Sequence, residues 1–78
     1  MDTQAILSNL QEIKSFFSIL HEEYGEVLAR GDIIGRIETS SNLSAAYALV
    51  GNAALAQKWA EEVKATLNKL YCERSNSD

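Results

Sequence analysis

The sequence predicts an all-α fold, and three observations carry this prediction. The 78 residues contain no proline and only four glycines, so little interrupts helix over long stretches. Apolar residues recur at alternating steps of four and three, which is the spacing of one helix face. Serine, asparagine and glycine gather between two such stripes, where a turn is expected. We therefore expect an antiparallel two-helix hairpin.

The first helix is predicted from about residue 3 to residue 30. Asp2 and Thr3 are both suitable N-caps, and Gly31 follows Arg30 as a C-cap. An unbroken heptad stripe predicts that this helix is packed along its whole length. We call this stripe the heptad seam, and it comprises Ile6, Leu10, Ile13, Phe17, Leu20, Tyr24 and Val27.

The segment from residue 31 to residue 42 is expected to connect the two helices. Ile33, Ile34 and Ile37 are too apolar for a free loop, so we expect them to close over the end of the hairpin. Ser40, Ser41 and Asn42 then supply the next N-cap.

The second helix is predicted from about residue 43 to residue 72, followed by a frayed tail at 73–78. Gly51 stands beside Asn52 inside it, and the sequence leaves open whether the helix breaks there. Its own heptad stripe is rich in alanine: Ala46, Leu49, Ala53, Ala56, Ala60, Val63, Leu67 and Leu70.

Large side chains of the first helix are expected to lie on small ones of the second. With a turn near Gly35, Phe17 would meet Ala56 and Leu20 would meet Ala53. Such alternation fills a core without voids and lets two helices approach closely.

Many apolar side chains remain outside this expected hairpin core. Residues 43–56 are apolar nearly all round, and a helix of this kind is buried on every side. A chain this short also needs support beyond a single core, and one cysteine with one histidine offers neither a disulfide nor a zinc site. We therefore predict a protein interface, with Trp59 as an anchor, at Phe16, Ile19, Leu28, Tyr47, Val50, Leu55 and Trp59.

Two kinds of partner fit this interface. A second copy would give a four-helix bundle of two hairpins. A larger protein with an apolar groove could instead accept the hairpin. We expect the homodimer, the heterocomplex, or both.

Charge and composition exclude other partners and suggest a compartment. The net charge of −4 and a pI near 4.8 argue against non-specific nucleic-acid binding and against anionic membranes. The start of the chain lacks a secretory signal, and residues 43–56 are too few to span a bilayer. The single cysteine, Cys72, fits a reducing, cytoplasmic setting.

The acidic stretch around Glu22, Glu23 and Glu26 has an EExxE pattern. This pattern resembles the first motif of the all-α, MazG-like nucleotide pyrophosphohydrolases, and the resemblance implies a magnesium site. The later ExxD motif of that family is missing, because aspartate occurs only at positions 2, 32 and 78. Three ligands from one helix are too few for magnesium, so we interpret these acids as a solvated face.

His21, the only histidine, is followed by Glu22. This dipeptide resembles the phospho-accepting site of histidine-kinase dimerisation domains. His21 together with Tyr24 and Gly25 resembles a phosphotransfer module that has lost its lysine. The basic residue and proline that usually follow are replaced by Glu23, Tyr24 and Gly25, and the neighbouring acids would repel a phosphoryl group. We interpret His21 as a surface or interface-flanking residue.

The sequence thus favours a small non-enzymatic protein-binding module that acts through an apolar helical face. No catalytic residue, cofactor or metal is expected. A regulator, an antagonist or a secretion-type co-chaperone would suit this size. The two-helix co-chaperones of type III secretion are similar in layout, which is an architectural analogy. The competing hypothesis is a MazG-like enzyme fragment or a His phosphotransfer protein.

Overall fold

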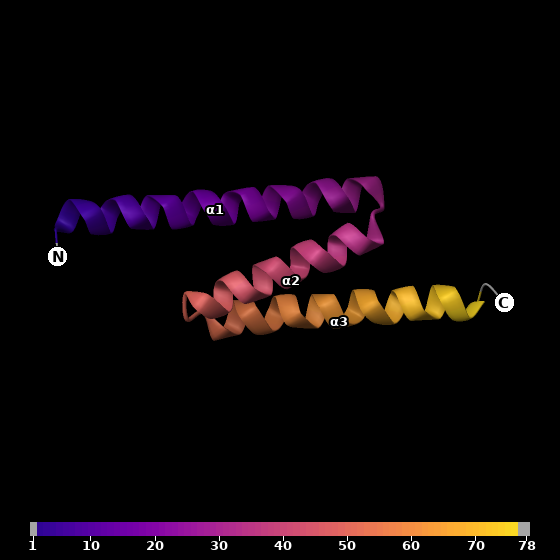
Figure 1. Ribbon diagram of the computed structural model, residues 1–78. Coiled ribbons are helices and arrows are strands. Elements are labelled where there is room, and N and C mark those ends of the chain that lie inside the picture. Colours follow the sequence, from indigo (N-terminus) through magenta and orange to yellow (C-terminus); the bar gives the residue numbers. More distant parts are fainter. Residues whose placement is uncertain (1, 77–78) are drawn as a thin grey trace.

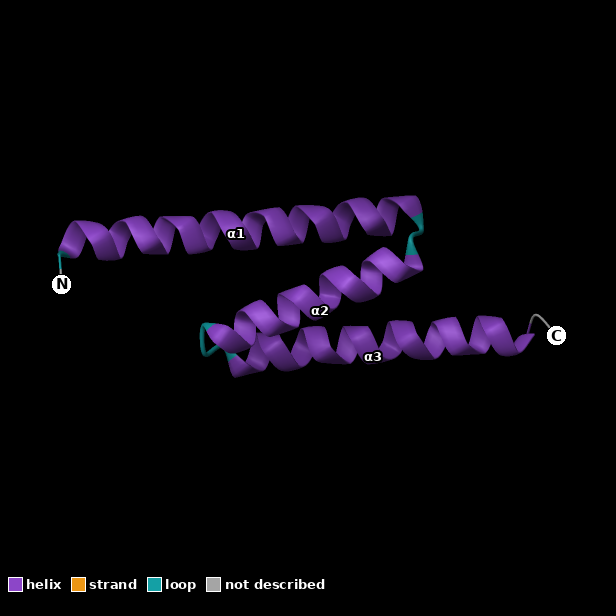
Figure 2. Ribbon diagram, in the orientation of Figure 1, coloured by secondary structure: helices purple, strands orange, loops and turns teal. Residues whose placement is uncertain are grey.

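The chain forms three helices in a computed structural model that describes residues 2–76 and the side chains of residues 2–72. They are α1 (Thr3–Arg30), α2 (Ile33–Leu49) and α3 (Ala53–Asn76), and the described residues contain no strand (Figures 1 and 2). The all-α class is therefore confirmed. The two-helix hairpin is wrong, because the chain reverses twice.

The first reversal takes only Gly31 and Asp32. Gly31 adopts the left-handed conformation with φ 69°, and its N–H donates to the carbonyl of Leu28, as a helix C-cap should. Asp32 then caps α2, since its Oδ1 accepts from the backbone N–H of Gly35 at 2.9 Å. The expected connection over residues 31–42 is thus helical from Ile33 onward, because a stop signal and a start signal are adjacent in the sequence.

The second reversal lies at Val50, Gly51 and Asn52. Gly51 has a φ of 81°, and Asn52 Oδ1 accepts from the backbone N–H of Leu55 at 3.2 Å. The break that the sequence left open is therefore present, and the continuous helix over 43–72 is wrong. Past residue 72, α3 continues to Asn76 through most of the expected tail.

The three helices form a single layer with α2 in the middle. The Cα atoms extend over 61 × 24 × 12 Å, so the molecule is long and flat. Successive helices are antiparallel, so α1 and α3 run in the same direction on opposite sides of α2 (Figure 1). Of the described helices, α2 packs against both others, whereas α1 and α3 reach each other only through side chains.

A small core sits where α1 crosses α2. Leu20, Leu43 and Ala46 are buried together. Phe17 stacks on Tyr47 with ring centroids 4.5 Å apart. The expected contacts of Phe17 with Ala56 and of Leu20 with Ala53 are therefore wrong, because α2 occupies the place that a single long second helix would have taken. Phe17, Tyr24, Tyr47 and Trp59 surround this core.

One carboxylate links all three helices. Glu62 on α3 accepts at Oε1 from the hydroxyl of Tyr24 on α1 at 2.9 Å and from Nε of Arg36 on α2 at 2.9 Å. The Nη2 atom of Arg36 also donates to this oxygen at 2.5 Å. This arrangement ties α1 to α3 across the layer.

None of the described helices combines the length and the apolar composition that a membrane crossing requires.

Candidate functional site

The N-terminal half of α1 projects beyond the other two helices (Figure 1). We call residues 3–16 the arm. Every side chain in the arm is exposed, and the first residue of α1 that its own chain partly covers is Phe17. The cause is length, because α1 has 28 residues and α2, which packs beside it, has only 17.

The arm carries the first part of the heptad seam into solvent. Ile6, Leu10 and Ile13 are 41%, 53% and 41% exposed. Leu20 and Val27, on the same seam nearer the turn, are buried. Leu7 and Phe16 flank the arm's part of the seam and are exposed as well. One continuous apolar stripe is therefore half covered by α2 and half uncovered.

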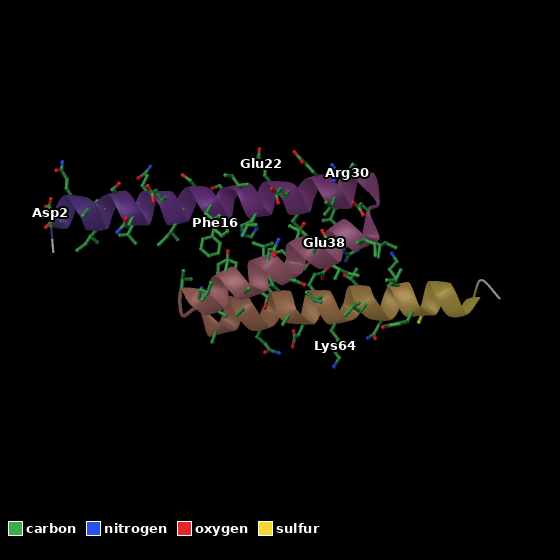
Figure 3. The ribbon with its side chains drawn as sticks, in the orientation of Figure 1. Asp2, Phe16, Glu22, Arg30, Glu38 and Lys64 are labelled. Atoms are coloured by element: carbon green, nitrogen blue, oxygen red, sulfur yellow. The ribbon has the colours of Figure 1, made fainter. Side chains whose placement is uncertain are left out.

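A shallow groove lies at the root of the arm, between α1 and α2. Its lining includes Phe16, Leu20, Ala45, Ala46 and Leu49. Figure 3 shows Phe16 pointing from α1 toward the end of α2. Leu49 is 88% exposed, so a strongly exposed apolar side chain borders the groove where the arm begins.

The alanines of α3 lie apart from α1. Ala53, Ala56 and Ala60 line an open groove with Ser44 and Ala48 of α2. The hydroxyl of Ser44 donates to the carbonyl of Ala56 at 2.8 Å, which holds the two backbones close. These small residues therefore allow α2 and α3 to pack together, and they do not support the first helix.

The seven residues predicted as an interface divide into two sets. Phe16, Ile19, Leu28 and Val50 are exposed. The remaining three, Tyr47, Leu55 and Trp59, are only partly exposed.

Tyr47 and Trp59 contribute to packing within the chain. The ring of Trp59 packs edge-on against Tyr24 with centroids 4.8 Å apart, and against His21 at 5.7 Å. Tyr47 stacks on Phe17. Much of the apolar surface that the described residues leave open therefore lies on the arm, away from Trp59, at Ile6, Leu7, Leu10, Ile13 and Phe16.

Sequence reasoning missed Ile6, Leu10 and Ile13 as open surface, because it assigned all three to the hairpin core. The available signal was the dipeptides Gly31-Asp32 and Gly51-Asn52. Each pairs a left-handed glycine with an N-cap residue. Two such signals make α2 short, and a short α2 cannot cover a long α1.

His21 and the acids at Glu22, Glu23 and Glu26 are the candidates for chemistry, and all four lie on α1. His21 Nε2 lies 2.8 Å from the hydroxyl of Tyr47, which occupies one of its ring nitrogens. Glu22, Glu23 and Glu26 are exposed, and Glu22 points away from the other helices (Figure 3). Within the described residues, no three His, Cys, Asp or Glu side chains lie close enough together to hold a metal ion.

Burial and hydrogen bonding shift the pKa values of the groups that meet at Glu62. Burial raises the pKa of the Glu62 carboxyl, but the hydrogen bonds from Arg36 and Tyr24 outweigh it and leave that pKa below its usual value. Burial, together with the Glu62 carboxylate, raises the pKa of Tyr24 above its usual value. Glu62, Arg36 and Tyr24 therefore form an interaction that holds the three helices together.

The arm itself is nearly neutral. Its only charged side chains are Glu12 and Lys14, whereas the other three acids of α1 lie beyond the arm, at residues 22–26. An apolar partner can therefore approach the arm without facing the negative charge of the rest of the chain.

Comparison of the chain with protein-family models, with curated proteins and with solved structures finds no match.

Proposed function

We propose that this protein is a non-enzymatic protein-binding module whose binding surface is the apolar face of the arm together with the groove at its root. The observation that carries the proposal is the exposure of Ile6, Leu10 and Ile13. These residues continue the stripe that packs against α2 further along the same helix.

The size and continuity of this surface support a binding role. Isolated apolar side chains on a surface are ordinary, whereas a contiguous patch is typical of an interaction site. The arm presents its apolar residues at helical spacing, which suits packing against another helix or insertion into an apolar groove. Leu7 and Phe16 widen the stripe on its two sides.

The partner is a second copy of the chain, a larger protein, or both in turn. Such a module would act as a regulator, an antagonist or a co-chaperone by covering an apolar surface on its partner. We place this activity in the cytoplasm, since Cys72 is an exposed free thiol and free thiols persist in reducing compartments.

The experiment compares the wild-type chain with Leu10→Glu and with the matched control Ser8→Glu. Both variants add one negative charge to an exposed position of the arm. Leu10 lies on the heptad seam, whereas Ser8 lies on the opposite side of the helix. Each purified chain is immobilised and exposed to an extract of its source cells, bound proteins are quantified by mass spectrometry, and its solution mass is measured separately.

The proposal predicts that wild type and Ser8→Glu bind the same protein, whether a second copy or another, and that Leu10→Glu loses it. Circular dichroism at matched concentration checks that the substitutions leave the helices intact. Identical binding by all three chains would contradict the proposal, as would a monomeric mass together with no specific capture.

A further inference from the structure

We infer that the arm pairs with the arm of a second copy, antiparallel and in one specific register. This inference rests on the proposed function and names its partner. It follows from where α2 ends along the heptad seam, from the spacing of the seam residues, from the charge of the arm and from the surface area of the chain.

The end of α2 limits which part of the seam is available. The ring of Tyr47 on α2 already covers Phe17, and α2 ends at Leu49. The seam is therefore open only at Ile6, Leu10 and Ile13, together with Thr3, which occupies the next heptad position before Ile6. An added antiparallel helix must fit within this length, because further along α1 it would collide with α2.

Heptad packing allows only a few antiparallel registers. In such a pair, alternate seam positions of one helix face the complementary positions of the other. On this helix one set of positions is Thr3, Leu10 and Phe17, and the complementary set is Ile6, Ile13 and Leu20. Each allowed register is therefore identified by the sum of the two facing residue numbers, which is 9, 16 or 23. The first register joins only Thr3 and Ile6, and the third drives residues 3 and 6 of the partner onto Leu20 and Phe17, which α2 covers.

The middle register, in which facing residue numbers add to 16, uses every open position of the seam. Ile6 faces Leu10 of the partner subunit, and Thr3 faces Ile13 of the partner subunit. By two-fold symmetry each of these layers occurs twice, which makes four layers in all. Leu7 of both copies flanks the symmetry axis, and this accounts for an apolar residue that the seam alone does not explain.

Charge does not oppose this pairing. Within residues 3–13 the only charged side chain is Glu12, which lies on the outer side of the helix, away from the seam. The acids at residues 22–26 of the two copies lie beyond opposite ends of the paired segment. Nine of the eleven acidic residues lie outside residues 2–13, so most of the negative charge of each chain is outside the paired segment.

The chain exposes more surface than a compact monomer of its mass. The accessible surface is 5718 Å², against about 4,700 Å² for a compact monomer of this mass. The radius of gyration, 15.7 Å, likewise exceeds the value of about 11.5 Å for a compact chain of this length. The projection of the arm contributes to this elongation, so the apolar side chains of the arm are surface that a second copy can cover. The pairing also places Thr3 of the partner subunit opposite Ile13, one turn from Phe16, which lines a groove together with Leu49.

Disulfide trapping tests both the partner and the register. All variants carry Cys72→Ser, so that no native thiol remains. One chain carries Ile6→Cys, a second carries Leu10→Cys and a third carries Ile13→Cys. Pairs of chains are mixed and oxidised at equilibrium, and the mixed and self-linked dimers are quantified by mass spectrometry.

The middle register predicts that the mixture of Ile6→Cys with Leu10→Cys gives mostly the mixed dimer, because these two positions face each other. Two Ile6 positions are displaced along the axis by four residues, or about 6 Å, which disfavours a disulfide. A preference for the mixture of Leu10→Cys with Ile13→Cys would overturn the register, and so would a statistical mixture.

Solution mass tests the second copy independently. The wild-type chain is expected to be dimeric at micromolar concentrations, and Leu10→Glu to weaken association at least about 100-fold, because each dimer contains this residue in two layers. A monomeric wild type would overturn the inference. If that monomer still captured another protein through Leu10, the proposed function would stand. If it captured none, both would fail.

Discussion

Replacement of Glu62 by glutamine removes the charge from the carboxylate that joins the three helices. Its Oε1 accepts from the hydroxyl of Tyr24 and from Nε of Arg36, both at 2.9 Å. Glutamine keeps the shape of the side chain. A hydrogen bond to a charged group contributes about 1.5–3 kcal/mol to stability. Because the side chains of Arg36 and Glu62 are 28% and 27% exposed, solvent screening reduces the stabilisation that this charged hydrogen bond provides. We expect a loss of about 1–2 kcal/mol at pH 7.

The loss should depend on pH in a direction that the structure fixes. Burial raises the pKa of Glu62, but its hydrogen bonds leave the pKa in the folded chain below its ordinary value of 4.5. The folded state therefore binds the proton less readily than the unfolded state. The stability contributed by the carboxylate is complete above pH 4.5 and is lost as the pH falls through the folded-state pKa.

Urea unfolding followed by circular dichroism measures this contribution. Wild type, Glu62→Gln and the neighbouring exposed control Glu61→Gln are compared at equal chain concentration, because association would shift stability. The control should lie within about 0.5 kcal/mol of wild type. The reasoning is refuted if Glu62→Gln is as stable as wild type at pH 7, or if its deficit persists undiminished in acid well below pH 4.5.

Three further substitutions test the turns and the core by the same unfolding assay. Gly51→Ala should cost about 1 kcal/mol, because a left-handed φ of 81° disfavours a side chain although nothing lies near the new Cβ; unchanged stability would refute this. Gly35→Ala should cost more, since its Cβ would lie 2.5 Å from Asp32 Oδ2 and 2.9 Å from Val27 Cγ1; a smaller loss than that of Gly51→Ala would contradict it. Ser40→Ala should raise stability by about 1 kcal/mol, because Ser40 Oγ is buried without a partner; destabilisation would argue against this explanation.

The sequence predicted the elements that depend on local signals. The first helix was placed at 3–30, and the structure has Thr3–Arg30, because Asp2 and Gly31 mark its ends and the heptad seam marks its face. The all-α class followed from the same periodicity and from the absence of proline.

The pairing of the helices could not be predicted so directly. Residues 33–42 contain three isoleucines and several polar residues, a mixture that suits either an apolar turn or a helix with one buried side. The choice depends on whether Gly31-Asp32 closes a two-residue turn, which is a matter of backbone conformation. Once that turn forms, α2 lies between the two long helices and the alanines of α3 face α2 instead of α1.

The open surface followed from a count of apolar residues, but its position did not. The sequence predicted more apolar side chains than two helices can bury, and Phe16, Ile19, Leu28 and Val50 are exposed in the structure. It named Trp59 as an anchor of the interface, and in the structure the ring of Trp59 packs against Tyr24 of its own chain. The arm was not expected as open surface, because a single long second helix would have covered it.

The projection of the arm also affects how firmly its backbone is ordered. A helix shorter than about 12–15 residues is marginal in water without tertiary support, and the arm has only its continuity with α1 and the cap at Asp2, which accepts from the backbone N–H of Gln4. Its amide hydrogens should therefore exchange with deuterated solvent sooner than those between Phe17 and Val27. Occupation of the apolar stripe would slow that exchange, so recognition and local folding would be a single event in this part of the molecule.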